Sequence, residues 1–409
     1  MGSDTRSCTR HPGASRARTL IAAVLFAGGL LAVGHGMVIQ RRVDGPSVWF
    51  RMSLDATKYI AMTEGQSLND PLFSPRIAIP GFAALLPLPA HEALRLISYV
   101  SLAAMYILQW LLLRRLGFHW KIRLLSIGAL FGTLTHMINY SNPFLTDAFA
   151  LLVLTAMFVA LEYRRDGLCA AMGLVGLLGR ETCLFGLPAY AVRGRWGRLA
   201  GLLLVAWLVF ATLRRWRFGG YEHPQLEQLA HWQYWAHASA SFGFLWVPML
   251  LGVGLVDWRR HPTVVWEALA LGGGAIITSL MSSDKIRMIG ILQVTAPVLW
   301  AAFLGRLGAG GRGWLPTFVC LVVAASLLAV PSVVLSQYAE GMTELEQWYF
   351  RLKGPIIVVQ VAGLGWGLAA GWRLRRALWA GWRENLGVLG RGVGIMRSLT
   401  GPAAAEVES

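Results

Sequence analysis

The chain has 409 residues, of which 56% are hydrophobic and only 14% are charged, against about 25% charged in a soluble domain. The net charge is +16, and 33 of the 37 basic residues are arginines. This composition excludes a soluble globular enzyme, a disordered chain and a fibrous repeat. The sequence also lacks the alternating strands of an outer-membrane barrel. The expected fold class is all-α, a polytopic bundle of transmembrane helices.

Apolar runs of about twenty residues recur along the chain, and each could cross about 30 Å of hydrocarbon. The predicted membrane segments are 19–39, 94–113, 122–138, 146–161, 168–179, 182–192, 199–213, 242–256, 263–281, 288–305, 314–334 and 355–372. Runs 168–179 and 182–192 form either one tilted span, interrupted by Arg180 and Glu181, or two short helices that rise to the outer face and return. The chain should therefore contain about 10–12 membrane segments in one transmembrane domain over 19–372.

Basic residues divide unevenly between the two sides of this arrangement. The segments that we place inside hold 23 Lys/Arg and, when Glu267 is counted with them, eight Asp/Glu, whereas the outer segments hold 14 Lys/Arg and 13 Asp/Glu. The inside segments are 1–18, 114–123, 162–167, 193–198, 257–262, 306–313 and 373–409. Because Lys and Arg collect on the cytoplasmic side of membrane proteins, the sequence predicts a multi-pass protein of the plasma (inner) membrane with both termini in the cytoplasm.

Three segments outside the spans have distinct predicted structures. The first outer loop, 40–93, contains the Pro-interrupted apolar stretch 77–89, which is too short for a span and should form an interfacial or re-entrant helix. Segment 335–354 should form an amphipathic surface helix. The tail 373–409 begins with closely spaced Arg and Trp residues, which predict a basic amphipathic helix on the anionic cytoplasmic leaflet.

Charged residues gather in the predicted outer segments at four places, and each has two interpretations. Asp55, just outside the first span, is either a general base or an ordinary solvated loop acid. Arg76 either holds a lipid phosphate or extends to the headgroups. Asp147 begins a span after a short turn, where it either faces a substrate or interacts favourably with the helix dipole.

The fourth place combines Arg180 and Glu181 with the later turn that contains Asp284, Lys285 and Arg287. Charged residues at membrane depth are costly and usually face a cavity or a partner. The alternative for both segments is a buried ion pair that fixes helix packing.

Signatures of metals, cofactors and nucleotides are missing from the sequence. The nine histidines show no close metal-ligand spacing, and there is no phosphate-binding glycine loop. The four cysteines share no pairing or metal spacing and are expected to be small buried hydrophobes. We therefore expect no metal, no cofactor and no nucleic-acid partner, and we attribute the positive charge to membrane topology.

The order and shared sidedness of the charged clusters resemble the GT-C superfamily of integral membrane glycosyltransferases, over roughly residues 45–300. The matching motifs are Asp55-Ala-Thr-Lys-Tyr59, Arg76-Ile-Ala-Ile-Pro80, Leu145-Thr-Asp147, Gly179-Arg180-Glu181 and Asp284-Lys285-Ile-Arg287, followed by Pro297. Members of this family take a sugar from a polyprenyl-phosphate donor and act on the non-cytoplasmic face. The resemblance implies a transferase of the cell envelope that moves a hexose or a pentose to a hydroxyl group of a glycan, lipid or protein.

The resemblance also implies a role for each charged residue. Asp55 would be the catalytic base that deprotonates the acceptor hydroxyl. The candidates for binding the donor phosphate are Arg76, Arg180, Lys285 and Arg287. Asp147 and Glu181 would position sugar or cation partners, and the substrate-binding set is completed by Lys58, Tyr59 and Asp284. Leu54 stands where the family often has a second acid, so no metal site is expected. Asp55 and the cations should converge in one outer chamber that opens to lipid.

Two other functions fit the same sequence. A transporter or flippase of an anionic lipid or lipid-linked sugar would use the cationic pocket without chemistry at Asp55, and its usual sign is an internal repeat with paired broken helices. A non-catalytic membrane subunit could share the fold, because fold alone does not determine function.

Overall fold

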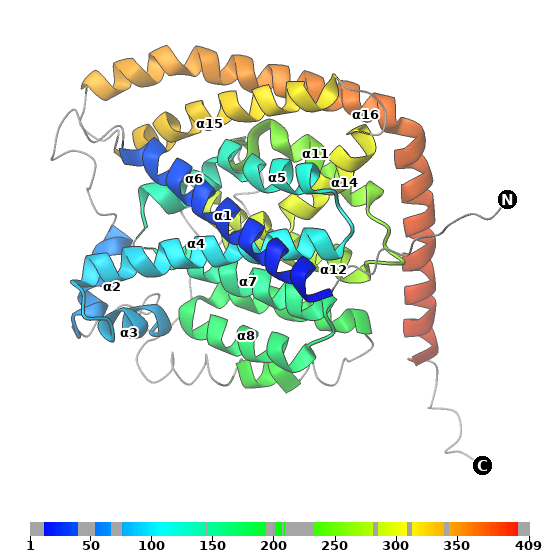
Figure 1. Cartoon of the computed structure of the whole chain (residues 1–409), viewed down its shortest axis with the longest axis horizontal. Coiled ribbons are helices and arrows are strands. Elements are labelled where there is room, and N and C mark those ends of the chain that lie inside the picture. The colour runs from blue at the N-terminus through cyan, green and yellow to red at the C-terminus, as the bar shows by residue number, and fades with distance from the viewer. Residues whose placement is uncertain are drawn as a thin grey trace.

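A computed structural model describes residues 12–39, 54–66, 76–143, 145–193, 199, 201–206, 208, 232–280, 285–308, 313–338 and 343–399. Every regular element within these ranges is a helix, so the predicted all-α class is confirmed there. Figure 1 shows several long helices that run side by side along the horizontal axis.

Four helical segments in the described part of the chain are long and apolar enough to cross a membrane: Ala90–Arg115, Ala238–Leu255, Pro262–Leu280 and Gly354–Leu386. A bent pair, Arg287–Val294 and Ala296–Gly308, passes the same test as one span broken by 56°. The structure therefore supports a multi-pass membrane protein by helix length and hydropathy, with four or five candidate spans among the described residues. This number is smaller than the 10–12 membrane segments that the sequence predicts.

Short and broken helices account for much of the difference. Helix α7 (Asp147–Glu162) has 16 residues and is therefore about 24 Å long, and the apolar part of α8 (Asp166–Gly179) is shorter still. The predicted segment 122–138 is divided among helices α5, η1 and α6 (Trp120–Gly128, Ala129–Gly132 and Leu134–Ser141). A hydropathy profile does not detect the breaks between these helices, so one apolar run in the sequence can correspond to several helices.

The interruption at Arg180 and Glu181 is also a break in the structure. Helix α8 ends at Gly179, Arg180 has an extended backbone, and the 3₁₀ helix η2 (Glu181–Arg193) follows. Helix η2 packs against both α8 and α12 (Pro262–Leu280). The chain changes direction at the two charged residues and η2 lies beside α8. This arrangement favours the two short helices over one tilted span interrupted by Arg180 and Glu181.

Small residues allow the helices to approach closely. A Cβ atom at Gly176 of α8 would lie 2.7 Å from Val153 Cγ1 of α7 and 2.7 Å from Cys183 Cβ of η2. A Cβ at Gly252 of α11 (Trp246–Leu255) would collide with the backbone of Leu299 in α14 (Ala296–Gly308). Close backbone contact at small residues is typical of helix packing in membranes.

The cysteines lie in different environments. Cys169 and Cys183 are buried, as expected, whereas Cys320 is exposed on α15 (Trp314–Tyr338). The prediction is wrong for Cys320 because its apolar helix lies at the surface of the bundle. Cys8 lies outside the described residues.

One end of the bundle, which we call the α2–α3 end, contains the first outer loop. Helices α2 (Leu54–Thr63) and α3 (Ala78–Ala84) lie at the left of Figure 1, beside the start of α4 (Ala90–Arg115). Helix α3 has seven residues and is about 10 Å long. Phe82 and Leu85 of the stretch 77–89 are exposed, and the choice between an interfacial and a re-entrant segment stays open.

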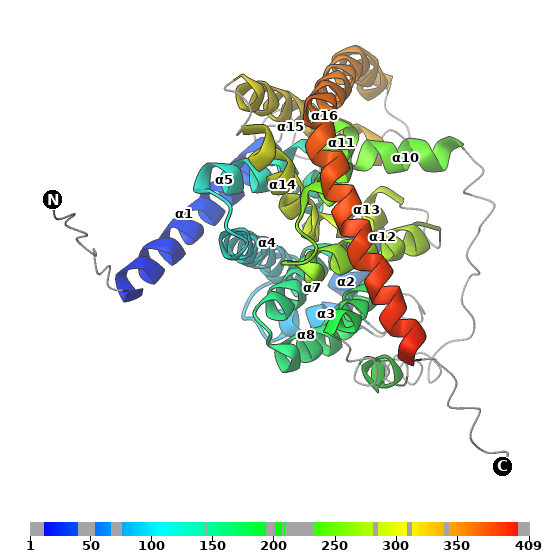
Figure 2. The same cartoon turned by 90° about the vertical axis from the view of Figure 1, so that its right-hand side faces the viewer.

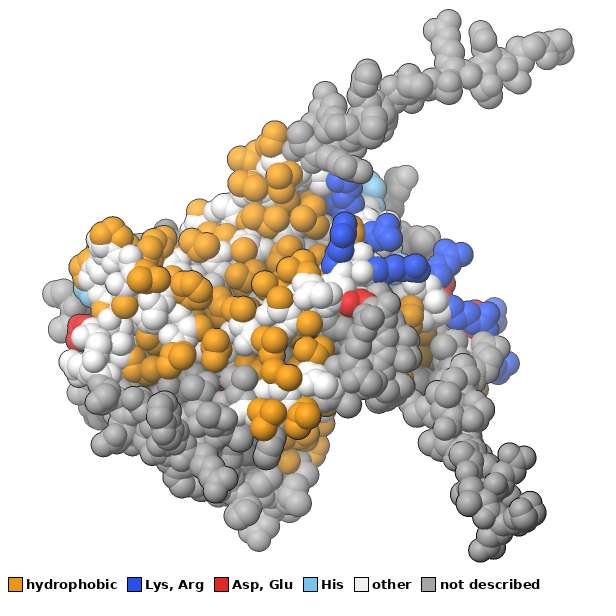
Figure 3. Space-filling model, turned by 90° about the horizontal axis from the view of Figure 1, so that it is seen from below, with side chains coloured by type: hydrophobic (Ala, Val, Ile, Leu, Met, Phe, Trp, Pro, Cys, Tyr) orange, Lys and Arg blue, Asp and Glu red, His pale blue; other side chains and the backbone are white. Residues whose placement is uncertain are grey.

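At the opposite end, which we call the α16 end, three of the predicted inside segments meet. Arg115 of α4 lies over the Tyr163 ring at 5.4 Å, and Thr263 of α12 donates a hydrogen bond to Glu162 of α7. Lys and Arg side chains gather at this end of the molecule, while apolar side chains cover much of the visible flank (Figure 3). The orientation of this end toward the cytoplasm stays a prediction.

Helix α16 (Thr343–Leu399) joins three segments that the sequence analysis treats separately. Its first part runs along the bundle, and after a bend its C-terminal part crosses the α16 end (Figures 1 and 2). Asn385 donates to the Val256 carbonyl at 3.1 Å and accepts from the Trp258 amide at 3.4 Å. The predicted tail helix is confirmed over 373–399, and it packs on the end of the bundle through Asn385.

Candidate functional site

Six charged or polar side chains from distant parts of the sequence meet at the α2–α3 end. This charged cluster consists of Tyr59, Arg76, Asp147, Arg180, Glu181 and Arg287. They come from α2, the residue pair before α3, the first turn of α7, the break between α8 and η2, and the short helix α13 (Lys285–Ile289). All six belong to the set that the sequence analysis selected.

Arg76 connects α2 with η2. Its guanidinium donates from Nη1 to the Tyr59 hydroxyl at 2.9 Å and from Nε to Glu181 Oε2 at 3.0 Å. A further ion pair joins Nη2 to Glu181 Oε1, which makes the contact bidentate. Because Arg76 is 7% exposed, it does not extend to the headgroups, and that interpretation of the sequence is wrong.

Asp147 lies between two guanidinium groups. Its Oδ1 pairs with Arg180 Nη1, and its Oδ2 lies 2.7 Å from Arg287 Nε. Arg180 also approaches the Met288 sulfur through Nη2 at 3.5 Å. One carboxylate therefore connects α7 to both the α8–η2 break and α13, as the buried ion-pair interpretation predicts.

Thr146 joins the two halves of the cluster. The hydroxyl groups of Tyr59 and Thr146 form a hydrogen bond of 3.2 Å, and Asp147 follows Thr146 directly. The side chain of Thr146 forms no capping hydrogen bond with α7, so its hydroxyl group serves as a contact with α2. From the sequence alone, a hydroxyl group before a span could either cap that helix or contact another helix.

The cluster carries charges of both signs. Among the described side chains it holds three guanidinium groups and two carboxylates. Arg180 is 2% exposed, and its Nε has no hydrogen-bond partner among the described residues. Buried guanidinium groups are strong binders of phosphate and carboxylate, so this arrangement is suited to an anion.

Three groups of the cluster outside the candidate spans have shifted pKa values. Burial, followed by the nearby guanidinium groups of Arg287 and Arg76, lowers the pKa of Arg180 to about 9. The other two shifts belong to the pair of Glu181 and Arg76. Burial alone would raise the pKa of Glu181, but the Arg76 guanidinium and the nearby Arg180 outweigh it and lower the pKa. Burial alone would lower the pKa of Arg76, whereas Tyr59 and the Glu181 carboxylate outweigh it and raise the pKa. Both shifts favour the charged forms, so the pair remains ionic over a wide pH range.

The other predicted site residues are only partly described. Lys58 is half-buried on α2, next to Tyr59. Backbone position 55 lies in α2 one helical turn before Tyr59, and position 285 begins α13. The side chains of Asp55 and Lys285, and the whole of Asp284, lie outside the described residues. The predicted meeting of the guanidinium groups is therefore observed, while the position of the Asp55 carboxylate stays a prediction.

A second polar network lies in the core and has no counterpart in the sequence analysis. The Tyr106 hydroxyl lies 2.6 Å from His136 Nε2 and 2.8 Å from the Tyr140 hydroxyl, and His136 Nδ1 lies 2.7 Å from Gln293 Oε1. Gln109 of α4 donates to the Gln293 carbonyl at 3.0 Å. The network fixes the helix η5 (Gly290–Val294), which directly follows the helix that carries Arg287. The signal that could have revealed it is the occurrence of neutral polar residues in apolar segments.

A carboxylate without a partner lies elsewhere in the bundle. Glu267, in the candidate span α12, is fully buried, and neither of its oxygens has a hydrogen-bond partner among the described residues. Within the same part of the chain, no three His, Cys, Asp or Glu side chains come together as ligands for a metal ion.

Comparison with known proteins adds no identification. No protein-family model, no curated protein and no solved structure matches the chain. The function is therefore inferred from the charged cluster and from the sequence motifs that supply its residues.

Proposed function

We propose that this chain is a membrane glycosyltransferase that moves a sugar from a polyprenyl-phosphate donor to an acceptor hydroxyl at the α2–α3 end of the bundle. The observation that carries the proposal is the meeting of Arg76, Arg180 and Arg287 with Asp147 and Glu181 at one end of the bundle. A helical chain with several candidate spans supports access by a lipid donor.

The donor phosphate is the part of the substrate that the cluster would bind. In the ground state, Asp147 and Glu181 hold the guanidinium groups in fixed positions. When the sugar–phosphate bond breaks, negative charge develops on the departing polyprenyl phosphate. Fixed cations that are already desolvated stabilise such charge without reorganising, so the buried arginines would favour the transition state.

Asp55 is the proposed general base. The acceptor oxygen attacks the anomeric carbon, the bond from that carbon to the phosphate oxygen breaks, and the electron pair leaves with the polyprenyl phosphate. The proton of the acceptor hydroxyl passes to the Asp55 carboxylate. The backbone supports this assignment, because position 55 is one turn from Tyr59, whose hydroxyl contacts Arg76.

The decisive experiment compares Asp55→Asn with Glu64→Gln, a matched change at an exposed acid on the same loop. Membranes containing each variant receive polyprenyl-phosphate donors that carry radiolabelled hexoses or pentoses, and labelled acceptor is counted. Transfer by Asp55→Asn should fall by about 10²–10⁴-fold, and transfer by Glu64→Gln should stay near wild type. Equal transfer by wild type and Asp55→Asn contradicts the role of Asp55. Movement of donor lipid without any transfer favours a flippase.

The proposal also requires the two ends to face opposite sides of the membrane. Cysteines introduced at Glu64 and at Arg165, in a chain whose native cysteines are replaced, test this requirement. A membrane-impermeant maleimide applied to whole cells should label position 64 and leave position 165 unlabelled until the cells are opened. Labelling of position 165 alone would place the charged cluster on the cytoplasmic side and contradict the proposal.

A further inference from the structure

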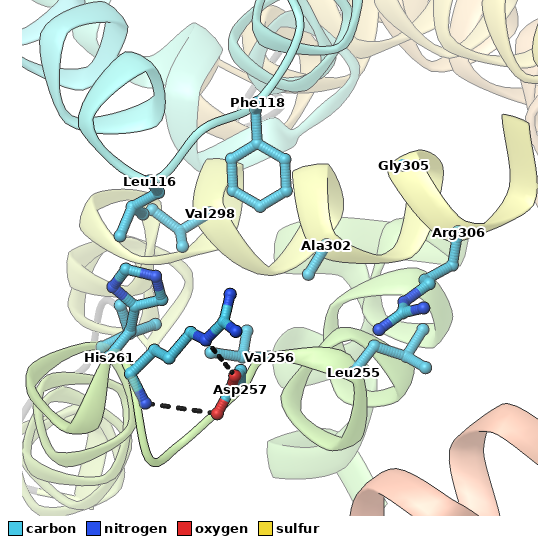
Figure 4. A pocket seen from close by; sticks show the side chains of 12 residues that line it. Leu116, Phe118, Leu255, Val256, Asp257, His261, Val298, Ala302, Gly305 and Arg306 are labelled. Carbon is cyan, nitrogen blue, oxygen red and sulfur yellow. Dashed lines mark hydrogen bonds and ion pairs between the residues drawn. The ribbon is translucent and has the colours of Figure 1, made fainter. Parts of the chain in front are cut away.

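A cavity of about 360 Å³ lies at the α16 end, away from the charged cluster. Its walls come from the turn after α4, the end of α11, the turn before α12, and one face of α14 (Figure 4). Phe118 extends from the first of these segments toward α14, and Val298 and Ala302 of α14 also line the cavity (Figure 4). One side of the cavity is therefore apolar.

Cations line the other side of the cavity. Arg260 pairs with Asp257 at 3.2 Å, so its charge is largely compensated. Arg306 lies in the last turn of α14, is exposed, and has no hydrogen bond or ion pair among the described residues. His261 Nδ1 lies 3.9 Å from Glu162 Oε2, so this ring faces a carboxylate. The cavity therefore combines an uncompensated cation with an apolar wall.

The tail helix holds the cavity wall in place and indicates its depth in the membrane. Asn385 of α16 bonds to the backbone at Val256 and Trp258, directly beside Asp257. Trp372 and Trp379 on the same helix are exposed, at 71% and 66%. Exposed Trp side chains beside arginines favour the level of the lipid headgroups, so the cavity opens where headgroups are present.

We propose that this cavity binds one anionic phospholipid, with its phosphate at Arg306 and part of an acyl chain against Phe118. A soluble anion would use Arg306 but would leave the apolar wall exposed to water. A neutral lipid would use the wall but would leave Arg306 without a partner. An anionic lipid can pair its phosphate with Arg306 and cover the apolar wall with an acyl chain. This binding site is independent of the proposed transferase activity.

The test is native mass spectrometry of the purified full chain titrated with phosphatidylglycerol or with phosphatidylcholine. Arg306→Gln removes the cation, and Ala302→Leu fills the apolar side. Arg165→Gln is the matched control, because Arg165 is an exposed cation outside the cavity. Each cavity variant should weaken the tightest phosphatidylglycerol binding by about tenfold, the loss expected for one hydrogen bond to a charged group or a few methylene contacts. The control should bind like wild type.

Several outcomes overturn the proposal. Equal binding of the two lipids by wild type, or equal losses in Arg306→Gln and Arg165→Gln, would show that the cavity does not select an anionic lipid. Inorganic phosphate is added in large excess in a parallel titration. Displacement of the bound lipid by phosphate alone would make the ligand a free anion. Thermal melting of each variant without added lipid checks that it is folded.

Discussion

The two ends of the bundle use arginine in opposite ways. At the α2–α3 end, Arg76 and Arg180 are 7% and 2% exposed and are held by carboxylates from other elements. At the α16 end, Arg259 and its partner Glu384 are 53% and 56% exposed and 3.4 Å apart. Exposed cations cost little to keep and can orient a chain in the membrane. Buried cations are costly unless they are paired, so their retention points to a site.

The comparison is tested most strongly by removing one carboxylate at each end. Asp147→Asn would leave two nearly buried guanidinium groups, on Arg180 and Arg287, without their shared counterion. The free energy of unfolding should fall by about 3–5 kcal/mol, because a buried charge is left uncompensated. Glu384→Gln breaks an exposed pair and should cost about 0–1 kcal/mol.

Both variants are measured by thermal or denaturant unfolding in the same detergent. Asp147→Leu serves as a second probe, since it removes the same charge and adds an apolar side chain. Equal and small losses in Asp147→Asn and Glu384→Gln would mean that the charged cluster is solvated, and the contrast between the two ends would fail.

The sequence predicts the membership of the charged cluster better than its pairing. Arg180 and Glu181 are conspicuous because they interrupt an apolar run. They do not pair with each other, since adjacent residues point in different directions. Glu181 binds Arg76, and Arg180 binds Asp147. Helix packing determines which ion-pair partner each charged side chain contacts. Composition and hydropathy do not predict these pairings.

The sequence predicts the all-α fold class correctly but predicts the boundaries of the helices less well. Apolar runs identify α4 and α12, whose lengths match a membrane span. They do not identify the turn that separates η1 from α6, nor the continuity of α16 across residues 343–399. Helix α16 continues through Pro355. Gly354 and the β-branched run 356–359 flank this proline, so local helix propensity does not predict the continuity. Breaks and continuity of this kind depend on a few backbone hydrogen bonds, which hydropathy does not measure.

Glu267 provides a further test, because it is a buried carboxylate with no hydrogen-bond partner among the described residues. Glu267 is buried like Asp147, but no cation or donor among the described residues contacts its oxygens. Replacing Glu267 with Leu should raise the free energy of unfolding by about 1–3 kcal/mol, because an unsatisfied polar group is removed from the core. The same unfolding measurement, with Glu267→Gln as an intermediate, decides the outcome. A loss of stability in Glu267→Leu would show that this carboxylate has a structural role.

The smallest expected effect concerns pH and the pair of Arg76 with Glu181. The pKa of Glu181 is lowered in the folded protein, relative to about 4.3 in an unfolded chain. A lowered carboxyl pKa contributes stability above the unfolded value, and this contribution is lost as the pH falls below it.

The melting temperature of wild type should therefore fall more between about pH 5 and pH 3 than that of Glu181→Gln, which lacks the titrating group. Other carboxylates titrate in both proteins, so the difference between the two curves isolates position 181. The difference should be modest, because the Glu181 side chain is 31% exposed and solvent screens its pairing. Parallel curves would place this pair with the solvated ion pairs of the α16 end, and only the Asp147 half of the cluster would then retain its buried character.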